Sequence, residues 1–137
     1  MSFKFEQLDV WKLSLEYSDS IYVLAEMLPE SERYNLKSQI VRAATSVSLN
    51  IAEGSTGQSD PEQSRFLGMA LRSLIETVAC QRLISRRKYV NDRNLMEKVD
   101  LQAQELAKRL NAFRRSLSNS KKSIGEDQAF YYTTDEF

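Results

Sequence analysis

The chain has 137 residues, the length of a single domain, and its 19 Lys and Arg residues balance 19 Asp and Glu residues, so the formal net charge is zero. Taken alone, this balance argues against a polyanionic partner. The sequence has no His, the commonest general base and metal ligand, and its single Cys excludes an internal disulfide and a thiolate metal cluster. We therefore expect a protein that is not an enzyme and that uses no cofactor or metal.

The amino-terminal sequence indicates a cytoplasmic protein. Charged residues interrupt the apolar ones over residues 1–9, so no signal peptide forms. No apolar run approaches the roughly 20 residues that cross a bilayer, and we expect no contact with a membrane. A single Cys also fits a reducing compartment.

The first predicted helix spans residues 8–28 and carries two neighbouring apolar stripes. One stripe consists of Leu8, Trp11, Leu15, Tyr22 and Ala25, and the other of Leu13, Tyr17, Ile21, Leu24 and Leu28. Pro29 ends the helix, because the residue before a proline is biased away from helical geometry. The apolar surface is wider than one bundle seam requires, which favours self-association; the alternative for Trp11 is a core position under a loop.

The second and third predicted helices flank a short loop. The second spans residues 36–53 with a core stripe of Leu36, Ile40, Ala43, Val47 and Ile51, and we expect Gly54 to cap it in the left-handed conformation. The third begins after Ser59, which can cap it, and Glu62 can complete a capping box. It runs to about Arg87, with an inward stripe of Phe66, Ala70, Leu74, Val78 and either Gln81 or Leu83.

The fourth predicted helix begins after a cap at Asn91 or Asp92. Its apolar residues alternate spacings of three and four, and they are Met96, Val99, Ala103, Leu106, Leu110, Phe113 and Leu117. Short loops make successive helices antiparallel neighbours, so the sequence predicts an all-α protein, an up-down-up-down antiparallel four-helix bundle over residues 1–117. Residues 118–137 form a predicted acidic-aromatic tail outside the bundle.

A polar stripe lies beside the apolar stripe of the second helix. Gln39, Arg42, Ser46, Asn50 and Glu53 share helical spacing, and Glu76 of the third helix offers a further acceptor for Arg42. These residues could form a binding or catalytic groove, but a carboxylate pair without a His or a nucleophile is a weak indication of an enzyme. We favour a structural hydrogen-bonded network between helices or subunits, because a buried charge needs a partner.

The neutral total conceals a basic segment. Residues 1–62 carry five basic and ten acidic residues, residues 63–122 carry fourteen and five, and residues 123–137 carry four acidic residues and no basic one. Two basic clusters dominate this segment, the first made of Arg82, Arg86, Arg87, Lys88 and Arg93 and the second of Lys108, Arg109, Arg114, Arg115, Lys121 and Lys122. The candidate nucleic-acid contacts are the cations of both clusters except Arg93, together with Arg65 and Arg72. Antiparallel packing places the two clusters at opposite ends of the bundle, with Arg65 and Arg72 beside the second.

Two interpretations of this basic segment stay open. Cations favour helix C-termini, where both clusters lie, so both could be ordinary solvated surfaces. Residues 108–122 contain six basic residues and no acidic one, which is more than the favourable interaction with a helix C-terminus requires. This excess favours contact with RNA or DNA phosphates, recognised by backbone and shape. The alternative function is a structural or adaptor protein whose basic surface binds an acidic peptide, either its own tail or a partner's.

The run from Gln39 to Gly54, with Gln-Ile-x-Arg-Ala at its start and Asn-Ile-Ala-Glu-Gly at its end, resembles the bacterial four-helix bundle family. That family is also called the 23S rRNA intervening-sequence protein family. The resemblance covers residues 5–115, and it is supported by Leu8, Val10, Trp11, Tyr22, Pro29, Glu32, Tyr34, Leu36, Phe66, Leu67, Ala70, Ser73, Leu74 and Glu76.

The resemblance implies a homopentameric ring of four-helix bundles without established catalytic residues. Members of the family are encoded in insertions within large-subunit ribosomal RNA genes and elsewhere in bacterial genomes. A related group, the accessory variability proteins of diversity-generating retroelements, comprises basic pentamers that bind nucleic acid and a reverse transcriptase. The expected partners are therefore further copies of the chain, RNA or DNA, and a protein such as a reverse transcriptase.

Overall fold

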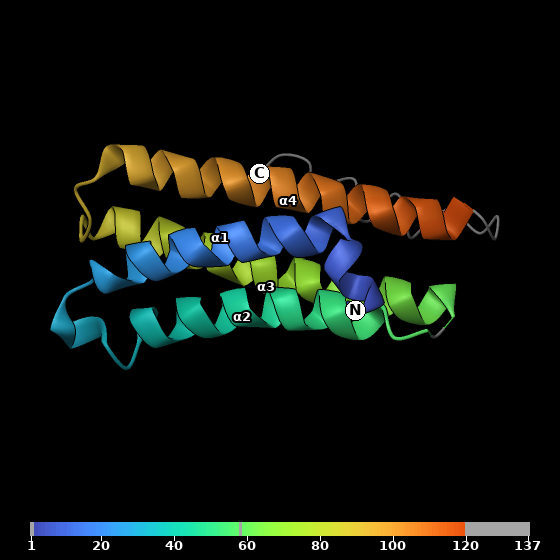
Figure 1. The fold of residues 1–137 in the computed structure, drawn as a ribbon. Helices are drawn as coiled ribbons and strands as arrows, with labels where there is room; N and C mark the ends of the chain where they lie inside the picture. Colours follow the sequence, from blue (N-terminus) through green and yellow to red (C-terminus); the bar gives the residue numbers. More distant parts are fainter. Residues whose placement is uncertain (1, 58, 120–137) are drawn as a thin grey trace.

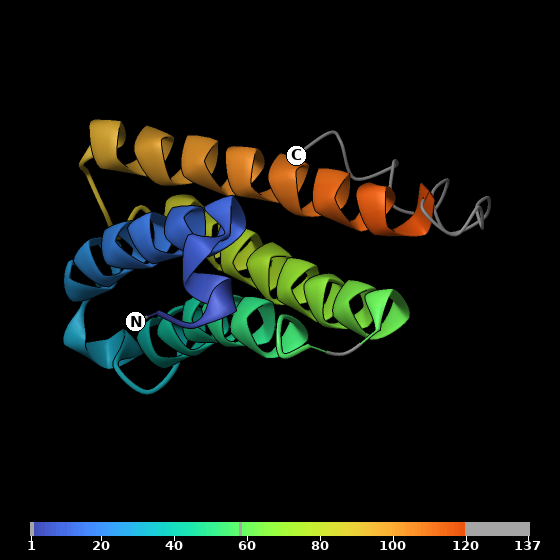
Figure 2. The same cartoon turned by 45° about the vertical axis from the view of Figure 1, so that its right-hand side comes forward.

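Four long helices make up the computed structural model, which describes residues 2–57 and 59–119 (Figure 1). The helices are α1 (Asp9–Glu26), α2 (Leu36–Gly54), α3 (Asp60–Arg86) and α4 (Arg93–Asn119), with short 3-10 helices η1 (Lys4–Gln7) and η2 (Glu30–Glu32). Successive helices run antiparallel, and α1 and α3 each pack against α2 and α4 (Figures 1 and 2). The predicted up-down-up-down bundle is confirmed. Its predicted separation from a tail at residue 118 stays a prediction, because residues 120–137 lie outside the described residues.

The connections gather at the two ends of the bundle. The η2 segment and the α3–α4 turn lie at one end, and η1, the α2–α3 connection and the last turn of α4 lie at the other (Figure 1). The Tyr89 hydroxyl donates a hydrogen bond of 2.8 Å to Glu32 Oε2, which joins the two connections at the first end. At the other end, Arg114 Nε of α4 donates to Ser64 Oγ of α3 at 3.2 Å. Arg86, Arg87 and Lys88 at the α3–α4 turn and Arg114 near the end of α4 therefore lie at opposite ends, as expected, whereas Lys108 and Arg109 lie near the middle of α4.

A continuous apolar core lies between the four helices. Its largest fully buried apolar side chains are Tyr17, Ile21, Leu24, Ile40, Val47, Ile51, Leu67, Leu74, Ile84, Leu106 and Leu110. The second predicted stripe of α1 supplies its buried side, whereas Leu15 and Tyr22 of the first stripe are 43% and 49% exposed. Trp11 is half-buried and packs edge-on against Phe5 of η1, with 4.7 Å between ring centroids. It therefore occupies a core position under a connecting segment.

The role predicted for Gly54 is wrong. Gly54 is the last residue of α2, and Ser55 caps the helix with φ of −102°, while the left-handed conformation falls on Gly57 with φ of 90°. At Gly54 the helices α2 and α3 approach closely, because a Cβ added there would be 2.8 Å from Phe66 Cβ. Packing between helices, and not turn conformation, therefore requires the glycine.

The helix starts follow the sequence signals. Ser59 Oγ accepts a hydrogen bond from the Glu62 backbone N–H at 3.4 Å, as expected of an N-cap, while the Glu62 carboxylate pairs with Arg65. At the start of α4, Asp92 Oδ1 accepts from the Leu95 N–H at 3.0 Å. Asp92 is therefore the cap of α4, which decides between the two predicted candidates.

A buried polar trio crosses the core from α1 to α3. The Tyr17 hydroxyl lies 2.7 Å from Thr77 Oγ1, which donates to the Leu74 carbonyl, and Gln81 Nε2 donates to Tyr17 at 2.7 Å. Gln81 is 1% exposed and Leu83 is 47% exposed, so Gln81 is the inward residue of the two candidates. Burial raises the pKa of Tyr17 from 10.0 to about 12, which keeps its hydroxyl protonated and able to donate.

Within residues 2–57 and 59–119, no helix combines the length and apolar character that crossing a membrane requires.

Candidate nucleic-acid interface

The first basic cluster surrounds the turn between α3 and α4. The N–H of Lys88 bonds to the Ser85 carbonyl and the N–H of Tyr89 to the Ile84 carbonyl, which is the Schellman arrangement of a helix C-terminus. Lys88 has a φ of 57°, a left-handed conformation that usually belongs to glycine at this position. The turn thus presents Lys88 beside Arg86 and Arg87, and all three side chains are exposed.

A hollow of about 340 Å³ opens beside this turn, lined by Leu83, Arg86, Arg87 and Tyr89. The carboxylate of Glu32 reaches the same region and accepts the Tyr89 hydroxyl. That hydrogen bond, with smaller contributions that include the charge of Arg87, lowers the pKa of Glu32 below 4.5. An ionised Glu32 therefore offsets part of the positive charge at this end of the bundle.

Several predicted contact residues are engaged within the chain. Arg82 pairs with Asp100 of α4 at 2.8 Å, and Arg109 pairs with Glu105 at 2.8 Å. Arg65 pairs with Glu62, and its guanidinium lies 4.7 Å from the centroid of the Phe66 ring. An anionic partner inside the chain reduces the charge that each of these arginines offers to a phosphate.

Arg114 is part of the packing between α4 and α3. Its side chain is half-buried, donates to Ser64, and crosses α3 at Gly68, where an added Cβ would lie 3.1 Å from the guanidinium. Arg114 therefore has a structural role here. Arg115 is half-buried, whereas Lys121 and Lys122 lie outside the described residues.

The outward cations of α3 follow one line along the helix. Arg65, Arg72 and Arg86 are separated by seven and fourteen residues, so they share one face with about 10.5 Å between successive seven-residue positions. The Arg82–Asp100 pair sets position 82 of α3 opposite position 100 of α4. In an antiparallel pair, Arg72 is then level with position 110, close to Lys108. Arg72 and Lys108 are both exposed and lie at about the same level along the bundle.

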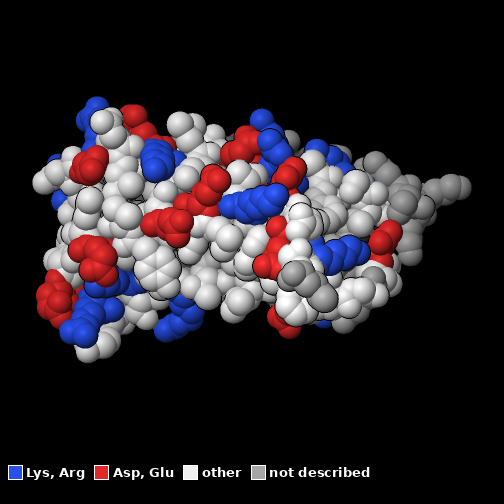
Figure 3. Space-filling model, in the orientation of Figure 1, with Lys and Arg blue, Asp and Glu red and all other residues white. Residues whose placement is uncertain are grey.

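The face of the bundle that carries α1 has a mixed charge. Acidic and basic side chains are interspersed over it, and no broad basic area covers its described residues (Figure 3). In this orientation α3 lies behind α1 (Figure 1).

Only some residues of the polar stripe of α2 are joined by hydrogen bonds within one chain. Ser73 Oγ of α3 donates to Ser46 Oγ at 2.9 Å, and Asn50 Nδ2 donates to the Ser46 carbonyl and hydroxyl at 2.9 and 3.1 Å. Arg42 is exposed and donates to Ser38 of its own helix at 3.1 Å. The side chains of Gln39, Glu53 and Glu76 are also exposed. Ser73 is the member that the helical spacing of α2 missed, because it comes from another helix.

The described residues contain no group of three or more His, Cys, Asp and Glu side chains that could hold a metal ion. Burial, with a smaller effect from Glu76, raises the pKa of the Cys80 thiol above 9.0, so this buried cysteine stays protonated at neutral pH.

The architecture is that of an all-helical, antiparallel four-helix bundle protein. The profile of the 23S rRNA-intervening sequence protein family matches residues 6–112, and the chain therefore belongs to this family. It is also similar to the crystal structure of a protein with unknown function from the S23 ribosomal protein family of Bacteroides thetaiotaomicron VPI-5482. The two are 28% identical with a TM-score of 0.70, over 77% of this chain and 95% of that one. No curated protein matches the chain.

Proposed function

We propose that this chain assembles into a homo-oligomer that contacts RNA or DNA through the basic surface of α3 and α4 and does not catalyse a reaction. The observation that carries the proposal is a set of outward cations without an anionic partner. Arg72, Arg86 and Lys108 are exposed, and none of them pairs with an acidic side chain among the described residues. Such cations keep their charge available for external phosphates.

Arg87 and Lys88 extend this surface around the α3–α4 turn. Consecutive cations that project from a turn can contact successive phosphates, and phosphate contacts carry no sequence information directly. The sequence offers no base-reading motif either. We therefore expect affinity for nucleic acid that depends strongly on salt and weakly on sequence.

Assembly would multiply these contacts. The outward surface of α1 and its C-cap carries four apolar side chains between 42% and 51% exposed, namely Leu15, Tyr22, Val23 and Met27. Large exposed apolar patches favour association, because burial removes them from water. The resemblance to pentameric relatives supports five copies, and it supports a reverse transcriptase or another nucleic-acid enzyme as a further partner.

The experiment measures binding of a fluorescent single-stranded RNA by anisotropy between about 50 and 200 mM salt. Replacing Arg72, Arg86 and Lys108 by Gln should weaken binding and reduce the slope of log K against log salt by about 2. A matched control replaces Lys12, Arg33 and Lys37, which lie on or next to α1 and α2, by Gln and should leave the slope nearly unchanged.

Absence of binding by the wild-type chain at about 50 mM salt would contradict the proposal, because phosphate contacts are strongest at low salt. Equal losses in the two triple variants would contradict the assignment to α3 and α4. Light scattering during size-exclusion chromatography, with the 260/280 nm absorbance ratio, reports subunit number and bound nucleic acid together.

Removing residues 123–137 distinguishes this proposal from the alternative function, an adaptor whose basic surface binds an acidic peptide. That segment carries four acidic residues and no basic one, so it can compete with phosphates for the same cations. Nucleic-acid binding that appears only after truncation would support a tail that blocks the basic surface. Loss of assembly after truncation would instead support a structural tail.

A further inference from the structure

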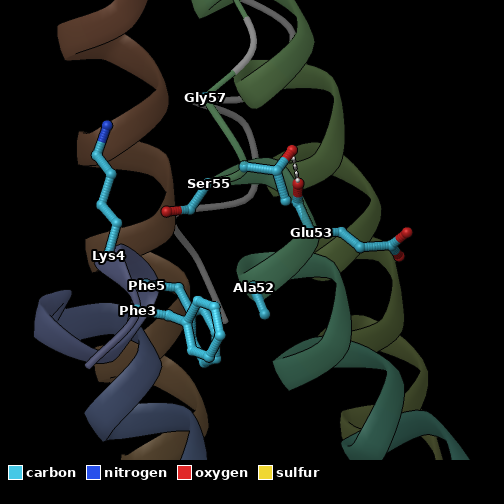
Figure 4. Close-up of a pocket in the computed structure, with 8 residues that line it drawn as sticks. Phe3, Lys4, Phe5, Ala52, Glu53, Ser55 and Gly57 are labelled. Atoms are coloured by element: carbon cyan, nitrogen blue, oxygen red, sulfur yellow. Dashed lines mark hydrogen bonds between the residues drawn. The ribbon is translucent and has the colours of Figure 1, made fainter. Parts of the chain in front are cut away.

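A second hollow, of about 610 Å³, lies between η1 and the carboxyl end of α2 (Figure 4). Its lining comes from Phe3, Lys4, Phe5, Ala52, Glu53, Ser55, Thr56 and Gly57. Phe3 is 74% exposed, although its ring stacks on Phe5 with 6.2 Å between centroids. The Glu53 carboxylate points away from the two rings (Figure 4). The hollow therefore offers an aromatic surface that water covers unfavourably.

Two polar groups limit what fits the hollow. Ser55 is 7% exposed, and its Oγ has no hydrogen-bond partner among the described residues. Buried hydroxyls nearly always have a partner, so this one indicates a ligand that supplies a hydrogen bond. Lys4 is exposed at the rim and forms no ion pair with a described residue. The matching ligand combines aromatic rings, a hydrogen-bonding group and a negative charge.

We propose that the C-terminal segment of this same chain, residues 130–136, occupies the hollow. The segment reads Phe130-Tyr131-Tyr132 followed by two Thr, Asp135 and Glu136, which supplies all three features within seven residues. Its aromatic rings pack on Phe3 and Phe5, a phenol or backbone group bonds to Ser55, and a carboxylate lies near Lys4. The proposal does not depend on contact with nucleic acid.

The chain is long enough to make this contact. Arg109 Nη1 lies 3.9 Å from Asp9 Oδ2, so α4 passes the start of α1 ten residues before it ends at Asn119. Ten helical residues cover about 15 Å, and a separation of eleven residues, as between Asn119 and Phe130, allows a span of at most about 36 Å. The last turn of α4 also lies at the same end of the bundle as η1 (Figure 1), which lines the hollow.

Trp11 is a built-in reporter, because it is the sole tryptophan of the chain and contacts Phe5. The test compares full-length wild type with a variant in which Phe130, Tyr131 and Tyr132 are replaced by Ser, exciting tryptophan selectively. We expect Trp11 emission at longer wavelength in the variant, because water enters the hollow. A control variant, Thr133→Ala with Thr134→Ala, should retain the wild-type spectrum. Equal spectra for wild type and the Ser variant would overturn the proposal.

A zero-length carbodiimide cross-link provides an independent measurement on the full chain. We expect a bond between the Lys4 amine and Asp135 or Glu136, identified by peptide mass mapping, and its loss in the Ser variant and in Phe3→Ser. Mixing isotope-labelled and unlabelled chains distinguishes the tail of the same chain from the tail of a second copy as the occupant of the hollow. Cross-links within one chain support the proposal, whereas cross-links only between labelled and unlabelled chains would assign the hollow to a second copy and overturn it. Absence of any cross-link to Lys4 would also overturn it.

Discussion

At the scale of single residues, Gly54 shows how closely two helices can approach when one position lacks a side chain. Ala at position 54 would place a Cβ 2.8 Å from Phe66 Cβ, and the rigid backbone of α3 cannot yield easily. We expect Gly54→Ala to lower the free energy of unfolding by about 1–3 kcal/mol, as overpacking does elsewhere. Urea denaturation monitored by circular dichroism measures the loss.

Gly68→Ala is the matched control for this prediction. Its added Cβ would meet only the guanidinium of Arg114, the movable end of a long side chain, at 3.1 Å. The helical preference of Ala over Gly is about 1 kcal/mol in a helix interior, so we expect little loss or a small gain. A loss at Gly68 as large as that at Gly54 would contradict the explanation by helix approach.

The titration of Tyr17 makes the free energy of unfolding depend on pH. Its pKa rises from 10.0 in the unfolded chain to about 12 in the folded protein, because burial disfavours the phenolate. The folded state therefore holds the Tyr17 proton more tightly, and this contribution is complete below pH 10 and is lost as pH rises from 10 to 12. The loss is about 1.4 kcal/mol for each pH unit in that interval.

Tyr17→Phe isolates this effect. At neutral pH the variant should be less stable by about 1–3 kcal/mol, because Gln81 Nε2 loses its acceptor in the core. The difference from wild type should narrow above pH 10, since only wild type has the titrating phenol. Urea denaturation at several pH values tests this, with Tyr34→Phe at an 85% exposed position as control. Parallel stability curves for wild type and Tyr17→Phe would argue against the burial of Tyr17.

At the scale of elements, the C-terminus of α3 holds a local strain beside its basic cluster. Lys88 has a φ of 57°, which disfavours a residue with a Cβ. We expect Lys88→Gly to raise the free energy of unfolding by about 0.5–1 kcal/mol, after allowing for the greater freedom of Gly in the unfolded chain. Thermal unfolding measures the gain. Arg87→Gly, at a right-handed position with φ of −85°, should instead lower stability.

The helix ranges were predictable to within two residues because the signals that set them are local. Pro29 ends the first helix, Ser59 caps α3, and the spacing of apolar residues in α4 fits a buried stripe. Each signal acts within one or two turns of the chain. The sequence could not decide whether Asn91 or Asp92 caps α4, because either side chain can cap a helix. The backbone geometry of the turn selects Asp92.

At the scale of the whole molecule, the exposed stripe of α1 governs association. Leu15 and Tyr22 are seven residues apart and therefore share one face. We expect the double variant Leu15→Gln and Tyr22→Gln to form smaller assemblies in size-exclusion chromatography with light scattering, with a nearly unchanged unfolding midpoint. Leu101→Gln, at a 63% exposed position on α4, is the control and should leave the assembly unchanged. Assemblies of wild-type size in the double variant would show that this stripe is not the contact.

The sequence by itself determined four antiparallel helices and the charge of each, because hydrogen bonding and amphipathic spacing in a helix involve residues close in the chain. It could not tell which cations face outward. Arg82 meets Asp100 eighteen residues later, and Arg114 meets Ser64 fifty residues earlier, so only packing decided that these two arginines are engaged while Arg72 and Lys108 are exposed. The same holds for Gly54 and Tyr17, whose roles depend on α3. Contacts between distant segments form only when the helices dock, and the tertiary structure therefore decided the candidate surface.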